Sequence, residues 1–142
     1  WVLMTRETAE MRLQSVQMGR SLLELLRNLD RLTSDQARWV DNHTATLPMM
    51  MALAFANDDA SVTNALHAYG FGWAENMTQA AIKSIPLGQS AGQRMLMTLA
   101  RAIPSAVARA IALPEDERVS FAPRLAILSS RHEHQYSRLF RS

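Results

Sequence analysis

Histidine side chains are the residues of this sequence with the clearest capacity to bind a metal. The four histidines are His43, His67, His132 and His134. The closest pair, His132 and His134, has an i, i+2 spacing, which on a helix points the two rings about 200° apart. No pair has the i, i+4 spacing of helical zinc sites. We therefore predict no metal-binding residue, and a metal site that uses His132 and Glu133 stays as the alternative.

The three consecutive methionines, Met49 to Met51, could suggest a copper site, because thioethers bind Cu(I). Successive side chains on a helix point about 100° apart, so these three cannot converge on one ion. Flexible, polarizable methionine side chains are well suited to fill a core. We predict that this segment packs in the interior.

The remaining residues contain no recognisable catalytic motif. The segment Gly88-Gln-Ser-Ala-Gly92 lacks the lysine of a phosphate-binding loop. No Ser/His/Asp set can be recognised from spacing. The sequence has no cysteine, which excludes disulfides and thiolate metal sites and is compatible with a reducing cytoplasm. We predict that the protein is not an enzyme and has neither catalytic nor cofactor-binding residues.

The segment 132–142 combines large apolar side chains with two arginines at the end of the sequence. Ordinary chain termini are polar and fray into solvent, whereas Tyr136, Leu139 and Phe140 are side chains that bind in pockets. Arginine is enriched at interfaces because its planar fork pairs with carboxylates and stacks on aromatic rings. We predict that 132–142 is a tail that docks on a partner.

Length and composition suit one compact domain, 1–142, since 48% of the 142 residues are hydrophobic. Of the fifteen basic residues fourteen are arginine, which favours fixed contacts and is also typical of a GC-rich genome. Acidic residues are interspersed, so we expect no nucleic-acid partner. The apolar run from Leu47 to Ala56 falls short of a bilayer span of about 20 residues, so we expect no membrane and a cytoplasmic location. The opening Trp1 suggests a fragment that lacks a native N-terminal segment.

Helical periodicity runs through the chain, and no segment has the pattern of a strand, so the predicted fold is all-α. The first long helix carries one stripe at spacings of three and four, predicted to face the core: Met11, Ser15, Met18, Leu22, Leu25 and Leu29. Gly19 lies within this helix at a cost of about 1 kcal/mol relative to alanine. This cost favours a close helix crossing at Gly19.

Capping patterns divide the rest of the chain into helices. Thr33-Ser-Asp-Gln36 is a capping box that begins a short helix, and Pro48 opens the next, which is apolar on all sides. A long helix follows as far as Ser84, and Gly70 and Gly72 near its middle indicate close packing against a neighbour. One face of this helix is apolar: Val62, Leu66, Tyr69, Trp73, Met77 and Ala80 or Ala81.

Two further helices complete the prediction. Ser90-Ala-Gly-Gln93 has the pattern of a second capping box, and Pro104 should kink or divide the helix that it begins. Pro123 is placed to open a final helix that runs toward Phe140. The packed edge of this final helix is predicted to comprise Leu125, Leu128, His132, Gln135 and Leu139.

Arginines repeat every seven residues on another face of the final helix, at Arg124, Arg131 and Arg138. From Arg124 onward the only acidic side chain is Glu133, so an acidic groove would complement this face. The alternative is a solvated face with arginines placed favourably near a helix C-terminus.

The closing sequence Arg131-His-Glu-His-Gln-Tyr-Ser-Arg-Leu-Phe-Arg-Ser142 resembles the end of the urease accessory protein UreF family at all but one position. His134 stands where that family usually has threonine. Further similarity lies in Pro86–Gln93, Arg6–Glu10 and Gln17–Leu23, so the resemblance extends along the whole chain. The resemblance implies that the family's N-terminal part is missing from this sequence.

The resemblance implies a single compact, UreF-like bundle of about six to seven helices that acts as a non-enzymatic chaperone. Proteins of this kind form dimers, bind an accessory protein called UreD or UreH, and recruit the GTPase UreG to insert nickel into the urease apoprotein. Nickel and GTP are handled by the partners. The resemblance places the contact with UreD or UreH on the C-terminal residues Arg131, Gln135, Tyr136, Arg138, Leu139, Phe140 and Arg141.

Two other classes remain open from the residues alone. One is a helical-bundle enzyme or metal-binding protein that uses His132 and Glu133. The other is a nucleic-acid binder, for which strong salt-dependent retention of duplex DNA would be needed.

Overall fold

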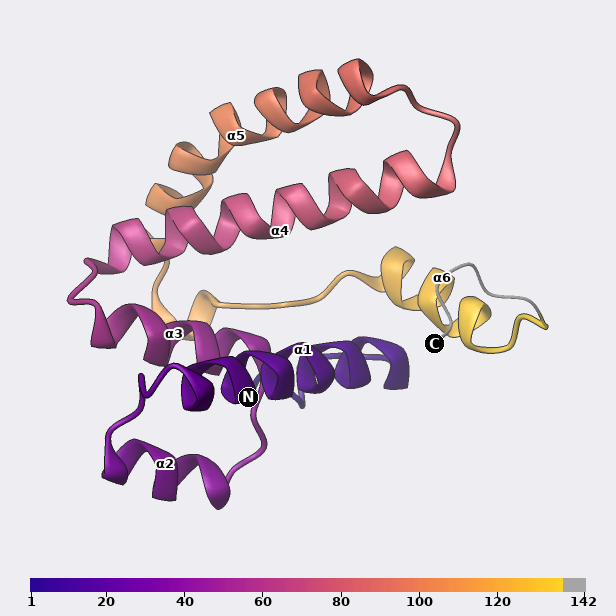
Figure 1. Cartoon of the computed structure of the whole chain (residues 1–142). Helices are drawn as coiled ribbons and strands as arrows, with labels where there is room; N and C mark the ends of the chain where they lie inside the picture. The colour runs from indigo at the N-terminus through magenta and orange to yellow at the C-terminus, as the bar shows by residue number, and fades with distance from the viewer. Residues whose placement is uncertain (137–142) are drawn as a thin grey trace. The chain divides into compact units, whose positions relative to one another are not determined.

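The computed structural model describes residues 1–136, and over these residues it is helical with no strand (Figure 1). This confirms the predicted all-α fold and its approximate number of helices. The α-helices are α1 (Ala9–Asn28), α2 (Ser34–Asp41), α3 (Leu47–Asn57), α4 (Val62–Ser84), α5 (Gln89–Ala112) and α6 (Pro123–Glu133), and Glu115–Glu117 forms a 3₁₀ turn.

The described residues form two compact units. The first contains residues 1–59 and 119–136, with α1, α2, α3 and α6, and the second contains residues 60–118, with the α4–α5 hairpin. The single domain 1–142 stays a prediction.

A small apolar core holds the first unit together. It is formed by Leu23 of α1, Val40 of α2, Ala45 in the connection and Met50 of α3. Met50 is completely buried, and Met49 packs against the core at its edge. The methionine run therefore supplies core side chains, as its helical spacing predicts.

At Gly19 the backbone of the connection before α3 comes very close to α1. A Cβ added at Gly19 would stand 2.4 Å from the carbonyl oxygen of Ala45 and 2.6 Å from the carbonyl carbon of Thr46. Backbone atoms cannot move aside as a flexible side chain can. A close approach at Gly19 is confirmed, although the backbone that meets it is the connection before α3 and not a crossing helix, and this approach explains why the position lacks a side chain.

The buried face of α1 differs in part from the predicted stripe. Its four buried residues are Ser15, Gly19, Leu23 and Leu26. Leu25 and Leu29, which were predicted to face the core, are 51% and 59% exposed. The buried face includes Gly19, because the absence of a side chain there lets the connection before α3 approach α1.

The first predicted capping box and the proline start are both observed. Thr33 Oγ1 accepts the backbone N–H of Gln36, while the Gln36 side chain accepts the N–H of Thr33. Pro48 lies in the first turn of α3, where its missing N–H costs nothing.

Helices α4 and α5 pack side by side as a hairpin (Figure 1). Ser61 caps α4 by accepting the N–H of Asn64. A Cβ at Gly70 would lie 3.2 Å from Cγ2 of Ile103, which confirms close packing at this glycine. Gly72 has nothing within 4 Å of its Cβ position, so the same prediction is wrong there.

Three other expectations for the hairpin need correction. The second capping box is wrong, because Gly88 occupies the N-cap of α5 and no side chain caps the helix. Pro104 does not divide α5, which runs unbroken from Gln89 to Ala112, and the alternative prediction of a kink at Pro104 stays a prediction. On α4, Trp73 and Met77 are 57% and 39% exposed, because α5 covers the face that carries Ala74 and Thr78.

Helix α5 is long and apolar enough to span a membrane when judged by length and composition alone. It also carries Arg94, Arg101 and Arg109, and it packs along α4. A single helix of this kind is weak evidence for a membrane span and does not by itself indicate a membrane protein.

Candidate functional site: the α6 seat and its outer face

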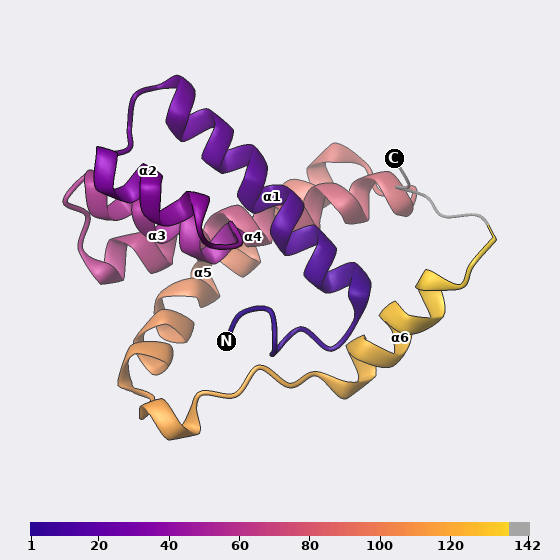
Figure 2. The ribbon, with the colours of Figure 1, turned by 90° about the horizontal axis from the view of Figure 1, so that it is seen from below.

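Helix α6 lies beside the N-terminal end of α1 (Figure 2). None of its residues is fully buried. Hydrogen bonds connect the side chains of α6 to the start of α1, in contrast to the apolar packing of the α1–α3 core. Polar groups therefore hold α6 against the start of α1. We call these residues the polar seat: Thr8, Glu10, Ser129, His132 and Glu133.

Glu133 completes the N-terminal cap of α1. The first N–H groups of a helix have no partner within it. Thr8, the N-cap residue, accepts the N–H of Met11 through its Oγ1, and Glu133 accepts the N–H of Glu10 at 2.8 Å. A carboxylate at this position also interacts favourably with the positive end of the helix dipole. A residue of α6 thus satisfies a backbone donor of α1.

A chain of hydrogen bonds runs beside this cap. The hydroxyls of Thr8 and Ser129 are 2.8 Å apart, and Ser129 donates to Oε2 of Glu10 at 3.3 Å. Oε1 of Glu10 lies 2.7 Å from Nδ1 of His132. An ionised carboxylate can only accept, so Nδ1 of His132 carries the proton in this contact. Glu10 therefore connects two residues of α6 to α1.

The segment that leads into α6 is held in the same way. Arg6 donates to the hydroxyl of Ser120 at 3.0 Å, and the backbone N–H of Ala122 donates to Glu7 at 3.1 Å. The hydrogen bond from Ala122 lowers the pKa of the Glu7 carboxyl, because it stabilises the ionised form. Residues 6–8, which precede α1, thus contact both the segment that leads into α6 and α6 itself.

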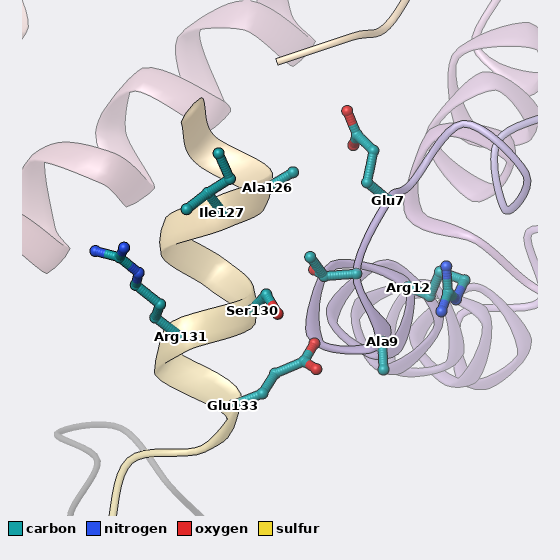
Figure 3. Close-up of a pocket in the computed structure, with 9 residues that line it drawn as sticks. Glu7, Ala9, Arg12, Ala126, Ile127, Ser130, Arg131 and Glu133 are labelled. Carbon is teal, nitrogen blue, oxygen red and sulfur yellow. The ribbon is translucent and has the colours of Figure 1, made fainter. Parts of the chain in front are cut away.

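An open groove lies between the start of α1 and α6 (Figure 3). Ser130 and Glu133 point from α6 toward α1, whereas the side chains of Ile127 and Arg131 extend to the other side of the helix, although both residues also line the edge of the groove (Figure 3). The polar seat therefore fixes which face of α6 is turned away from α1.

That outer face is apolar and basic. Ile127 and Leu128 are 56% and 55% exposed, and Arg124 and Arg131 are exposed on the same side of the helix. We call these four residues the α6 outer face. Ile127 was not named from the sequence. Its i+3 spacing from Arg124 places the two residues on one face of a helix and could have indicated that it belongs to this face.

The predicted packed edge of the final helix is largely wrong. Leu125 and Leu128 are exposed, whereas the half-buried residues are Ala126, Ser129, His132 and Glu133. The cause is the polar N-terminal end of α1, whose groups need hydrogen-bonding partners. The face of α6 that carries Ser129, His132 and Glu133 supplies these partners and therefore packs against α1. Among the described residues of the predicted edge, only His132 is half-buried as expected.

The structure describes three of the seven predicted partner-binding residues. Arg131 lies on the α6 outer face, and Gln135 and Tyr136 are exposed beyond the end of the helix. The other four lie outside the described residues: Arg138, Leu139, Phe140 and Arg141.

The predicted continuation of the final helix through Tyr136 is wrong. Helix α6 ends at Glu133 with His134 as its C-cap. Its last turn tightens, with the N–H groups of His134 and Gln135 donating to carbonyls three residues earlier. The His134 ring also contacts the carbonyl oxygen of Ser130, which would otherwise accept the next helical N–H.

The alternative metal site at His132 and Glu133 gains no support from the geometry. His132 is engaged by Glu10, and Glu133 accepts a backbone N–H. Within residues 1–136, no group of three or more histidine, cysteine or acidic side chains is arranged to hold a metal ion.

Comparison with known proteins agrees with the resemblance seen in the closing residues. The UreF family model matches residues 1–100. The chain belongs to the UreF family. Relatives named urease accessory protein UreF include those of Polaromonas sp. (strain JS666 / ATCC BAA-500), 60% identical, and Paracidovorax citrulli (strain AAC00-1), 58% identical, each aligned with the whole of this chain.

A third relative of the same name, from Methylibium petroleiphilum, is 53% identical over the whole chain. The chain spans 61%, 58% and 61% of the lengths of these three UreF proteins. No solved structure matches the chain.

Proposed function

We propose that this chain is part of a urease maturation chaperone, a scaffold that joins a UreD/UreH-type accessory protein to a UreG-type GTPase for nickel insertion into the urease apoprotein. The observation that carries the proposal is membership of the UreF family, whose three relatives above are named urease accessory proteins. Nickel and GTP belong to the partners in this scheme, and the chain itself performs no catalysis.

The proposed contact with the UreD/UreH-type protein is the C-terminal segment. Two features of the described part support it. Tyr136 is fully exposed, as an aromatic side chain that anchors in a partner's pocket must be before binding. Arg131 lies five residues before Tyr136 in the sequence and can orient an acidic partner surface through charge.

The test is co-purification of the full-length protein with the UreD/UreH-type partner, with and without residues 136–142. We expect the deletion to abolish co-purification and leave the far-ultraviolet circular dichroism nearly unchanged, because the removed residues follow the last described helix. A Tyr136→Phe variant, which keeps the ring, is the matched control and should bind. Undiminished binding by the deleted protein would overturn the proposed role of the tail.

The other parts of the proposal concern assembly and location. We propose a homodimer in the cytoplasm that binds neither nucleic acid nor membrane. Equilibrium dialysis of the isolated chain with nickel separates this scaffold from a metal-binding protein. Weak or no retention of nickel is expected, and tight stoichiometric binding would favour the alternative at His132 and Glu133.

A further inference from the structure

We propose that the outer face of α5 is the surface on which the UreG-type GTPase docks, through an acidic helix of that partner. The inference rests on the proposed function and deepens it, because that function names the GTPase as a partner without assigning it a contact on this chain. We call this surface the α5 basic face, and its residues are Arg94, Arg101, Ser105, Ala108, Arg109 and Ala112.

The α5 basic face lies on the side of the helix that faces away from α4. A Cβ added at Gly92 would meet the side chains of Ile82 and Thr78, so Gly92 marks the side of α5 that contacts α4. Arg101 comes nine residues after Gly92, which turns it about 180° from this contact on a helix of 3.6 residues per turn. Arg94 lies two turns before Arg101 on the same side.

The arginines of this face have no acidic neighbours in the sequence. From Asn76 to Pro114 there are four basic residues and no acidic one. Arg94, Arg101 and Arg109 are exposed, and none of them forms an ion pair with any residue in the range 1–136. In the first unit, by contrast, three arginines each pair with an aspartate. The arginines of the α5 basic face are therefore left to pair with carboxylates of a partner.

The small side chains of this face favour a helix as the docking element. Three exposed residues follow Arg101 on the same side of α5, at i+4, i+7 and i+11: Ser105, Ala108 and Ala112. The distance between packed helices depends on the side chains at the contact, so these residues let a second helix approach closely. Carboxylates at positions i and i+7 of that helix would lie about 10.5 Å apart, which is also the spacing of Arg94 and Arg101. Each guanidinium could then form a bidentate pair with a carboxylate.

A membrane and a nucleic acid fit this face less well than an acidic protein surface does. A helix that lies on a membrane buries large apolar side chains, whereas the uncharged members of the α5 basic face are serine and alanine. Proteins that bind duplex DNA carry a denser basic patch. The occupant is therefore a protein with a row of carboxylates.

The position of the α5 basic face in the chain favours the GTPase over the other partner. The contact proposed for the UreD/UreH-type protein follows α6, whereas α5 belongs to the second unit. A scaffold that joins two partners at the same time needs a separate surface for each. The α5 basic face supplies the second surface.

The test is charge reversal in the full-length protein, with the dissociation constant for the purified UreG-type GTPase measured in the presence of the UreD/UreH-type partner. Arg94→Glu and Arg101→Glu should each weaken GTPase binding about tenfold or more, because each places a carboxylate against an acidic surface. Arg20→Glu is the matched control, since Arg20 is also exposed and outside the ion pairs of residues 1–136 but lies on α1. The control should bind the GTPase like the unmodified protein, and all three variants should bind the UreD/UreH-type partner normally.

The dependence on salt gives a second readout. Arg101→Gln, which removes the charge without reversing it, should weaken GTPase binding less than Arg101→Glu does. Added salt should slow association of the GTPase with the unmodified protein more than with Arg101→Gln, because ions screen long-range steering.

The outcomes separate this inference from the proposed function. If both glutamate variants bind the GTPase as tightly as Arg20→Glu, the α5 basic face is not the docking surface, while the scaffold function stands. If the unmodified protein does not bind the GTPase, both proposals fail. The unmodified protein but not Arg101→Glu might be retained on duplex DNA or on vesicles of phosphatidylglycerol and phosphatidylcholine. That result, with GTPase binding unchanged in the variant, would assign the face to a nucleic acid or a membrane and overturn the inference.

Discussion

Helix α1 makes two contacts within the first unit that differ in their chemistry. Toward α3 the contact is apolar and close, with Met50 fully buried and the backbone of Ala45 and Thr46 set against Gly19. Toward α6 the contact consists of hydrogen bonds among half-buried side chains around Glu10. One helix thus joins a packed core at one side and a polar seat at its start.

The difference shows how the fold can hold a helix without burying it. Apolar packing contributes roughly 25 cal/mol per Å² of buried surface, whereas a typical hydrogen bond contributes a net of about 0.5–1.5 kcal/mol. The α3 contact places the buried apolar side chains of the first unit against α1. The α6 contact orients a helix whose apolar side chains remain exposed, which is the arrangement that docking requires.

The largest effect is expected at the apolar contact. Gly19→Ala would place a methyl group 2.4 Å from a backbone oxygen, so it should lower the free energy of unfolding by about 1–3 kcal/mol. Gly72→Ala is the matched control, because it adds the same methyl group within a helix where nothing lies within 4 Å. It should raise the free energy of unfolding by about 0.5–1 kcal/mol. Urea denaturation followed by circular dichroism measures both. A stabilised Gly19→Ala variant would show that the contact is not tight.

A smaller effect is expected at the polar seat. Glu133→Ala removes the acceptor for the N–H of Glu10 and should cost about 1 kcal/mol, the typical value of a lost helix cap. Glu133→Gln keeps an acceptor oxygen and loses the charge at the helix dipole, so it should cost less. Amide hydrogen exchange should become faster at the start of α1 and in α6 in the alanine variant. Equal effects of the two variants would contradict a capping role.

The smallest effect concerns pH. The pKa of Glu7 is lowered in the folded protein by the N–H of Ala122, so ionised Glu7 favours the folded arrangement at neutral pH. This contribution is present above the pKa of Glu7 in the unfolded chain and is lost as pH falls through the lower folded value. NMR titration of the Glu7 side chain should show a pKa below the ordinary glutamate value of about 4.3. A value at or above the ordinary one would show that the contact does not persist in solution.

Local patterns in the sequence predicted much of the fold. The all-α class, the capping box at Thr33 and the close approach at Gly19 each depend on a few neighbouring residues. The family resemblance was carried by the closing residues, and it is confirmed by the match over 1–100.

The errors about the buried faces of α1, α4 and α6 share one physical cause, which is that helical periodicity finds an apolar face but not its neighbour. Leu128 was assigned to a packed edge because apolar faces usually turn inward. The polar start of α1 selects the opposite face of α6, and the acceptors needed there come from residues more than a hundred positions away. Trp73 is exposed for a related reason, since α5 packs against a different face of α4.

Amide hydrogen exchange of the full-length protein, alone and with the UreD/UreH-type partner, tests the central claim most directly. Without the partner, residues 123–133 should exchange faster than α3, because α6 is held by hydrogen bonds at the surface and not by a core. With the partner, exchange in 123–133 should slow markedly while α3 changes little. Exchange in α6 as slow as that in α3 without the partner, or no slowing on binding, would contradict the account.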